Sequence, residues 1–222
     1  MTAVADIVVL FDVDNTLLDN DRVIADIGAY LDSNFSAAVR ERYWQIFEEL
    51  RISLGYADYL AALQRYRLEA MHEPRLLAMA TWLIDYPFAE RLYPGAIAAV
   101  DHARSWGTPV ILSDGDAVFQ PRKVQRSGLL GAFGQGNVLI YVHKEQELAD
   151  VERLFPARRY VMVDDKLRIL TAMKQIWGPR LVTIFPRQGH YALDAKAIAQ
   201  YPPADIAIDS IGDLARVQLP AA

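Results

Sequence analysis

Cysteine is absent from all 222 residues of the sequence. The chain therefore has no disulfide bonds, no thiolate nucleophile and no zinc site with cysteine ligands. A chain without cysteine suits a reducing compartment, and we expect a cytoplasmic protein.

Long hydrophobic runs are also absent. No apolar stretch reaches the roughly 20 residues that a membrane-spanning helix needs. The first apolar run, residues 7–11, ends at Asp12 and has no basic segment before it, so it does not resemble a signal peptide. We expect a soluble protein without a membrane partner.

Positive charge is in slight deficit, with 23 Lys and Arg against 28 Asp and Glu and a net charge of -5. This balance provides no basic field for a nucleic acid, which we do not expect as a partner. Hydrophobic residues make up 53% of the chain and charged residues 23%, an ordinary globular balance. The length fits one domain that carries a modest inserted one.

Short apolar runs rich in β-forming residues recur along the chain. Each run is continuous rather than alternating, as expected for strands that are buried on both faces. Helical patterns separate the later runs, and the alternation from about residue 94 predicts right-handed βαβ units and a parallel, doubly wound sheet. In two of these helices we expect inward-facing side chains that include Ile97 and Ile176. The predicted strands are residues 7–11, 109–112, 138–142, 160–163, 181–185 and 205–208.

Residues 20–90 show helical periodicity and contain no convincing strand. This pattern predicts a helical insertion between the first strand and the rest of the α/β core. We place an all-helical domain at residues 18–90 and the core at residues 1–17 and 91–222. Two apolar stripes are interpreted as the core of the helical bundle: Val39, Tyr43, Ile46, Phe47, Leu50 and Leu54; and Leu76, Leu77, Ala80, Leu83 and Ile84.

Polar side chains follow four of the predicted strands directly. Ligands of open parallel sheets bind beyond the carboxyl ends of the strands, so these side chains are expected on one rim. Carboxylates that crowd together repel one another, and a hard cation with oxygen ligands, such as Mg²⁺, usually offsets this repulsion. The residues are Asp12 and Asp14, Ser113, Lys144, and Asp164 with Asp165.

Each of these residues also has a purely structural explanation. Asp and Asn often form turns, Ser113 could cap a helix, Lys144 could be a solvated helix start, and Asp164 and Asp165 could cap the helix at Lys166. Their conjunction at four successive strand ends favours the functional interpretation.

The reaction that suits this set is phosphoryl transfer, which depends on positioning and charge neutralisation. Asp12 can attack phosphorus and form an aspartyl-phosphate, while Asp14 acts as acid and then base. Ser113 can bind a phosphoryl oxygen and Lys144 can balance charge. Magnesium would bridge Asp12, Asp164 and the phosphate.

The segment FDVDNTLLD resembles the first motif of the haloacid dehalogenase (HAD) superfamily, and Ser113, Lys144 and the Asp164-Asp165 pair fall at its second, third and fourth motifs. The resemblance implies a Rossmann-like core, a helical cap inserted after the first motif, and magnesium. It also implies that the main-chain carbonyl of Asp14 binds the metal, that Asp164 is a ligand directly or through water, and that Asp165 supports it. The expected function is a magnesium-dependent phosphatase, a hydrolase of phosphoric monoesters.

Two positions depart from the family pattern. Many relatives have Asn after the second-motif serine, whereas this chain has Asp114, which we expect to face away as an N-cap. Lys123 competes with Lys144 for the third-motif role, and Lys144 is preferred because it directly follows an apolar strand.

Two other functions compete with the phosphatase. One is metal-independent haloacid dehalogenation, whose enzymes lack an acid at the position of Asp14; the other is a non-catalytic regulatory or binding role. The cap suits a small phosphorylated substrate such as a nucleotide, sugar phosphate or phosphoglycolate, and the sequence does not define the oligomeric state. Segment 185–191 is polar, follows a strand and could reach the rim, but a plain surface loop is the preferred prediction. Cap residues that could contact substrate, although packing is favoured for them, are Tyr43, Trp44, Arg51, Tyr56 and Tyr59.

Overall fold

The structure is a computed structural model that describes residues 4–220. Its six strands form one sheet in the order β3-β2-β1-β4-β5-β6, and every neighbouring pair is parallel. This topology confirms the predicted α/β fold with a Rossmann-like parallel sheet. The strands are β1 (Ala5–Phe11), β2 (Thr108–Asp114), β3 (Val138–Tyr141), β4 (Ala157–Val163), β5 (Leu181–Pro186) and β6 (Ile206–Ile208).

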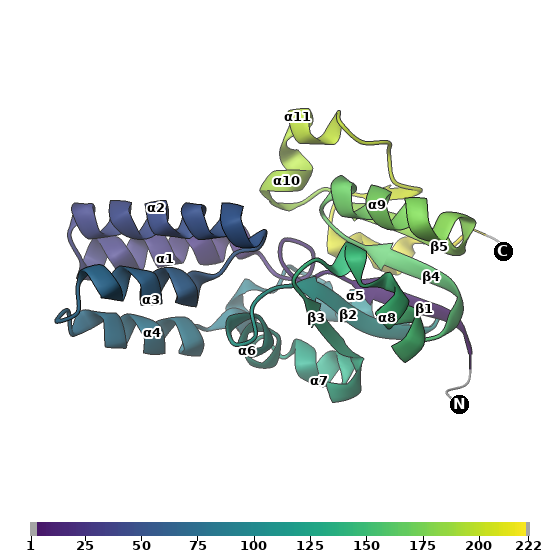
Figure 1. Cartoon of the computed structure of the whole chain (residues 1–222). Helices are drawn as coiled ribbons and strands as arrows, with labels where there is room; N and C mark the ends of the chain where they lie inside the picture. The colour runs from purple at the N-terminus through teal and green to yellow at the C-terminus, as the bar shows by residue number, and fades with distance from the viewer. Residues whose placement is uncertain (1–3, 221–222) are drawn as a thin grey trace.

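Helices cover both faces of the sheet (Figure 1), as the continuous apolar strands require. Val9 and Phe11 of β1 pack in one hydrophobic cluster with α5 and α7, whereas Val8 and Leu10 pack in a second cluster with α8 and α9. The helices after the insertion are α5 (Ala96–Ala103), α6 (Phe119–Arg126), α7 (Leu129–Phe133), α8 (Leu148–Leu154), α9 (Leu167–Trp177), α10 (Gly189–Leu193) and α11 (Ala195–Ile198). Short 3-10 helices are η1 (Phe88–Arg91), η2 (Gln135–Asn137), η3 (Lys144–Gln146), η4 (Gly178–Arg180) and η5 (Ile211–Arg216).

The segment between β1 and η1 folds into four helices that lie to one side of the sheet (Figure 1). One hydrophobic cluster runs without a break from these helices to a face of the sheet. We call the four helices the cap. The boundaries predicted for it, at residues 18 and 90, stay a prediction. The cap helices are α1 (Asn20–Asn34), α2 (Ala37–Leu54), α3 (Tyr59–Glu69) and α4 (Arg75–Asp85).

Local signals set the limits of the cap helices. Asp19, Ser36 and Asp58 accept hydrogen bonds from first-turn amides and so begin α1, α2 and α3. Gly55 ends α2 with a φ of 82°, a left-handed conformation that glycine adopts without strain. Over residues 4–220, no helix combines the length and apolar character that crossing a membrane takes.

Several apolar side chains that were predicted to face inward are exposed instead. Ile97 is 38% exposed, Ile176 62% and Leu77 78%, and Leu54 is exposed as well. Each of these exposed residues lies in a helix that has apolar residues on more than one face. Other residues of the same helix form the buried stripe. The residues that are buried in its place include Ala96, Ala99 and Val100 in α5; Leu76, Met79 and Leu83 in α4; and Leu170 and Met173 in α9.

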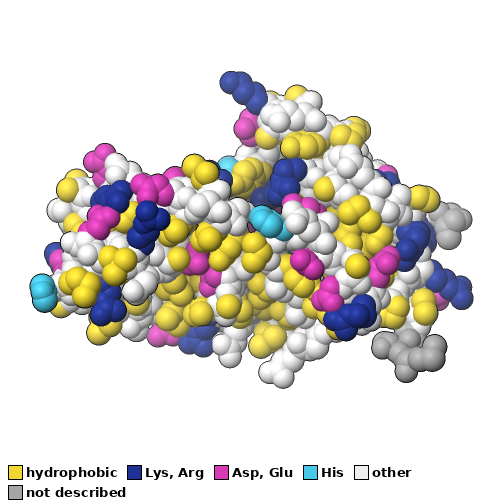
Figure 2. Space-filling model, in the orientation of Figure 1, with side chains coloured by type: hydrophobic (Ala, Val, Ile, Leu, Met, Phe, Trp, Pro, Cys, Tyr) yellow, Lys and Arg dark blue, Asp and Glu magenta, His cyan; other side chains and the backbone are white. Residues whose placement is uncertain are grey.

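The surface carries charges of both signs. On the face shown in Figure 2, Lys and Arg side chains are interspersed with Asp and Glu over both the cap and the core. No continuous basic band crosses this face. The absence of a nucleic acid partner nevertheless stays a prediction.

Gly107, which links α5 to β2, provides a test of how tightly the sheet is packed. A Cβ atom at this position would overlap the main-chain carbonyl of Ile7 in β1. We expect Gly107→Ala to lower the free energy of unfolding by about 1–3 kcal/mol, measured by urea denaturation. The control is Gly131→Ala in α7, where a Cβ atom would meet open space. The control variant should be as stable as the original or more stable, by up to about 1 kcal/mol.

Candidate active site

Three buried carboxylates meet at the carboxyl edge of the sheet. Asp12 directly follows β1, and its amide donates to Val163 O of β4 at 3.0 Å. This pairing brings Asp12 beside Asp164 and Asp165, which directly follow β4. Each of the three side chains offers an oxygen within 4.8 Å of the others, and all three are buried. The sheet register therefore assembles the predicted acidic cluster.

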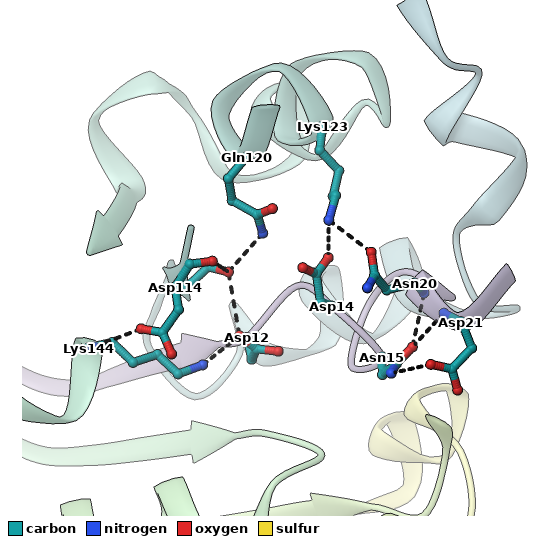
Figure 3. A network of polar contacts seen from close by, with 10 residues as sticks. Asp12, Asp14, Asn15, Asn20, Asp21, Asp114, Gln120, Lys123 and Lys144 are labelled. Carbon is teal, nitrogen blue, oxygen red and sulfur yellow. Dashed lines mark hydrogen bonds and ion pairs between the residues drawn. The ribbon is translucent and has the colours of Figure 1, made fainter. Parts of the chain in front are cut away.

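Lys144 lies inside this cluster. Its Nζ is 2.5 Å from Asp12 Oδ1 and 2.7 Å from Asp164 Oδ2. Ser113, at the end of β2, lies within 3.5 Å of Asp12 Oδ1 and accepts a hydrogen bond of 3.0 Å from Gln120 (Figure 3). The structure thus places Lys144, the preferred lysine, beside the predicted nucleophile.

Asp14 points to a different partner (Figure 3). Its Oδ1 accepts a hydrogen bond of 2.5 Å from the buried ammonium of Lys123, which also donates to Asn20 Oδ1 at 3.0 Å. From the sequence, Lys123 was predicted only as a rival of Lys144, whereas the structure gives the two lysines different carboxylates. Lys123 lies on the buried face of α6 with Phe119 and Val124, and a lysine in such a stripe is the signal that was available.

Asp114 does not cap the helix that follows it. The N-cap position of α6 is Val118, and the amides of Val118 and Phe119 donate to the carboxylate of Asp116. Asp114 Oδ1 instead accepts the amide of Lys144 at 2.7 Å, since β2 continues through Asp114 and pairs with Tyr141. The predicted N-cap role is therefore wrong, and the side chain braces the turn that carries Lys144. Burial raises the pKa of Asp114.

Burial dominates the electrostatics of the cluster. It raises the pKa of Asp164 to about 6, against the opposing effect of Lys144, and raises the pKa of Asp165 well above its ordinary value. Burial disfavours the charged form of Lys144, yet Asp12, Asp164 and Asp114 together hold the pKa of this lysine above its usual range. Burial therefore favours the protonated forms of Asp164 and Asp165 more strongly than the neighbouring lysines oppose it.

Several oxygens of the cluster lack donors. Among the described residues, Asp12 Oδ2 and both carboxylate oxygens of Asp165 are buried and have no hydrogen-bond partner. Leaving a buried charged oxygen without a partner costs free energy, and hard divalent cations prefer such oxygens as ligands. Asp12, Asp164 and Asp165 thus fit a Mg²⁺ ion. The role of the Asp14 carbonyl as a further ligand stays a prediction.

Segment 185–191 is not the plain surface loop that was predicted. Gln188 Nε2 donates to the carbonyls of Asn15 and Thr16 at 3.1 and 2.7 Å. The amide of His190 donates to Asp21 Oδ2 at 2.8 Å, and its ring Nδ1 lies 2.5 Å from Asp21 Oδ1. The segment follows β5, whose carboxyl end is on the same edge as that of β1, so it clamps the loop after Asp12. Nothing in the spacing of its residues indicated these partners.

A cavity of about 590 Å³ lies between the cap and the core. Asp14, Asp114 and Lys123 line it from the core. Of the predicted cap contacts, Arg51, Tyr56 and Tyr59 line the cavity, but Tyr43 and Trp44 do not. Tyr43 is buried and donates to Tyr59 O at 3.0 Å, and Trp44 packs edge-on against Phe47. The cavity brings substrate-sized space to the side chain of Asp14.

Comparisons with known proteins agree with this architecture. The model of the haloacid dehalogenase-like hydrolase family matches residues 8–176. A haloacid dehalogenase-like hydrolase from Burkholderia xenovorans is 61% identical over 96% of this chain and 99% of its own, with a TM-score of 0.91. The comparison with curated proteins found no match.

More distant structures show the fold alone. An L-2-haloacid dehalogenase from Xanthobacter autotrophicus, with chloropropionic acid covalently bound, is 18% identical over 94% of this chain and 96% of its own, with a TM-score of 0.61. A HAD-hydrolase from Bacillus subtilis, bound to magnesium, is 18% identical over 96% of this chain and 98% of its own, with a TM-score of 0.63. The fold thus occurs both in an L-2-haloacid dehalogenase and in a hydrolase that binds magnesium.

The oxygens without donors predict a response to Mg²⁺. We expect Mg²⁺ to raise the melting temperature of the original protein and to leave that of Asp165→Asn unchanged, because the variant loses one buried carboxylate whose two oxygens have no donor. Saturating metal stabilises by about 3 kcal/mol at a hundredfold excess over the dissociation constant, a shift of several degrees. Differential scanning fluorimetry measures it, with the exposed Asp209→Asn as control. Equal Mg²⁺ responses in all three proteins would contradict the assignment.

The raised pKa of Asp164 predicts the pH dependence of stability in EDTA. The folded protein holds this proton with a pKa of about 6, whereas the ordinary value is 3.8. The folded state therefore binds the proton more tightly than the unfolded chain, so the free energy of unfolding should fall as pH rises from about 4 to about 6. Each pKa unit corresponds to about 1.4 kcal/mol. Urea titrations of the original protein and Asp164→Asn measure this slope, which should be shallower in the variant.

Proposed function

This chain belongs to the haloacid dehalogenase-like hydrolase family, and from that premise we propose that it is a magnesium-dependent phosphatase acting on a small organic phosphate monoester. The observation that carries the proposal is the set of buried oxygens of Asp12 and Asp165 that have no donor among the described residues. A divalent cation satisfies such a set, whereas a metal-independent reaction has no use for it.

The first half of the reaction forms a covalent intermediate on Asp12. Its carboxylate attacks phosphorus, the bond from phosphorus to the leaving oxygen breaks, and Asp14 gives its proton to that oxygen. The products of this step are the free alcohol and an aspartyl-phosphate. The ammonium of Lys123, 2.5 Å from Asp14 Oδ1, balances the carboxylate charge that Asp14 then carries.

The second half hydrolyses the intermediate. Asp14 takes a proton from a water molecule, the water oxygen attacks phosphorus, and inorganic phosphate leaves while the Asp12 carboxylate is restored. The hydroxyl of Ser113, oriented by Gln120, can donate to a phosphoryl oxygen. Lys144 keeps Asp12 in place through both steps by its contact of 2.5 Å. Mg²⁺ bound at the acidic cluster supplies positive charge that lowers the repulsion between the phosphate and the carboxylates.

The sequence also predicted two alternatives, metal-independent dehalogenation and a non-catalytic role. The side chain of Asp14 bears on the first, and a measurement of activity bears on the second. Metal-independent dehalogenation requires no acid at this position, and the Asp14 side chain here lines the cavity. The fold likeness to an L-2-haloacid dehalogenase, at 18% identity, gives no ground to choose between the reactions. A non-catalytic role would leave the paired and buried side chains of the cluster without a chemical use.

Release of inorganic phosphate from p-nitrophenyl phosphate tests the proposal directly. We expect activity that requires Mg²⁺ and that Asp12→Asn lowers by about a thousandfold or more, because the nucleophile is lost. The exposed Asp209→Asn serves as the matched control and should retain activity. The measurement is kcat with and without EDTA. Chloride release from 2-chloropropionate in EDTA, without phosphate release in Mg²⁺, would establish the dehalogenase instead.

A further inference from the structure

The basic side chains of the cavity wall are matched with carboxylates in all but one instance. Lys123 pairs with Asp14, Arg51 with Glu48, Arg168 with Glu145 and His190 with Asp21. Among residues 4–220, the ammonium of Lys166 has no carboxylate within 4.0 Å, although it also lines the cavity. Lys166 is thus the basic side chain of the cavity wall that has no carboxylate of the described residues in direct contact.

The backbone fixes the place of Lys166. It directly follows Asp165 and precedes α9, and its amide donates to Asp164 Oδ1 at 2.8 Å. The ammonium lies 5.0 Å from the centroid of the Tyr191 ring. An aromatic face attracts a cation while leaving its N–H donors available, so the contact orients the lysine without saturating it.

The segment that carries Tyr191 is itself firmly held. Gln188 and His190 tie it to the loop after Asp12 and to Asp21 at the start of α1. A Cβ atom at Gly189 would overlap the Asn15 side chain, so the backbone of Gly189 lies directly against that side chain. Tyr191 thus lines the cavity from a segment of the core that is tied to the loop after Asp12, and Phe47 and Tyr56 line it from the cap.

The reacting phosphoryl group has its own partners. Ser113, Lys144 and the acidic cluster lie together at the ends of β1, β2 and β4, and Lys144 is committed to Asp12 and Asp164. Lys166 takes no part in these contacts and faces the cavity instead. Burial disfavours the charged form of Lys166, but Asp165, Asp12 and Asp164 act on it from beyond 4.0 Å and hold the pKa of this lysine above its usual range. A neutral organic group there would leave the ammonium without an anion in direct contact, whereas an anionic group would supply one.

We propose that Lys166 binds a second anionic group, a carboxylate or a further phosphate, on the organic part of the phosphate monoester. This inference rests on the proposed phosphatase function. It deepens that function by narrowing the substrate class to phosphate monoesters with an additional negative charge.

The test compares substrates that differ by one anionic group. O-phosphoserine is paired with phosphoethanolamine for the carboxylate, and fructose 1,6-bisphosphate with fructose 6-phosphate for the second phosphate. We expect kcat/KM to be about tenfold higher or more for the doubly anionic member of at least one pair, mainly through KM. The pair that shows the preference identifies the anion.

Variants then assign the preference to one side chain. Lys166→Met should reduce the ratio of kcat/KM within the pair by about tenfold, while Lys166→Arg should retain most of it because the positive charge remains. Arg40→Met is the control: it removes a cap cation that does not line this cavity and that pairs with Asp32 at 3.0 Å. It should leave the ratio unchanged.

Two results would overturn the inference alone. One is that the original protein is an active phosphatase but shows no preference for the doubly anionic substrate in either pair. This result requires no variant. The other is Lys166→Met lowering kcat/KM equally for p-nitrophenyl phosphate and for both members of each pair, which would assign the lysine to the reacting phosphoryl group. If the original protein releases no phosphate from any substrate with Mg²⁺, the proposed function itself fails.

Discussion

Parallel pairing of β1 with β4 forces Asp12 against Asp164 and Asp165, and the rest of the site is organised around the resulting repulsion. Lys144, at the start of η3 after β3, offsets part of this repulsion at 2.5 Å from Asp12 and 2.7 Å from Asp164. With Asp14 and Asp114 included, the site contains five carboxylates and three ammonium groups, those of Lys123, Lys144 and Lys166. With all of these groups ionised, two negative charges remain, which is the charge that one divalent cation brings.

The sequence was sufficient for those parts of the site that depend on the sheet alone. Continuous apolar runs identify buried parallel strands, and the carboxyl ends of such strands share one edge, so Asp12, Ser113, Lys144 and Asp164 could be placed together. Their contacts require only correct strand order and register. The same reasoning preferred Lys144 over Lys123, and the structure places Lys144 beside Asp12.

Contacts between loops and helices were beyond sequence reasoning. The partners of Lys123 and Asp114 depend on where α6 and the turn after β3 lie in space, and neither is encoded by a period or a motif. The same holds for Gln188, whose acceptors are 172 and 173 residues away along the chain. Helix faces such as those around Ile97 were misjudged because apolar residues on both sides of a helix leave its orientation undecided.

Gln188 and His190 form a clamp that joins three separate regions of the chain. Asp21 belongs to the first turn of the cap, Asn15 and Thr16 follow the nucleophile, and the clamp itself extends from β5. A rotation of the cap at its root carries Asp21 with it and pulls on the backbone of His190. One short segment of the core thus ties the first turn of the cap to the loop that carries the nucleophile, so neither can shift without breaking hydrogen bonds to it.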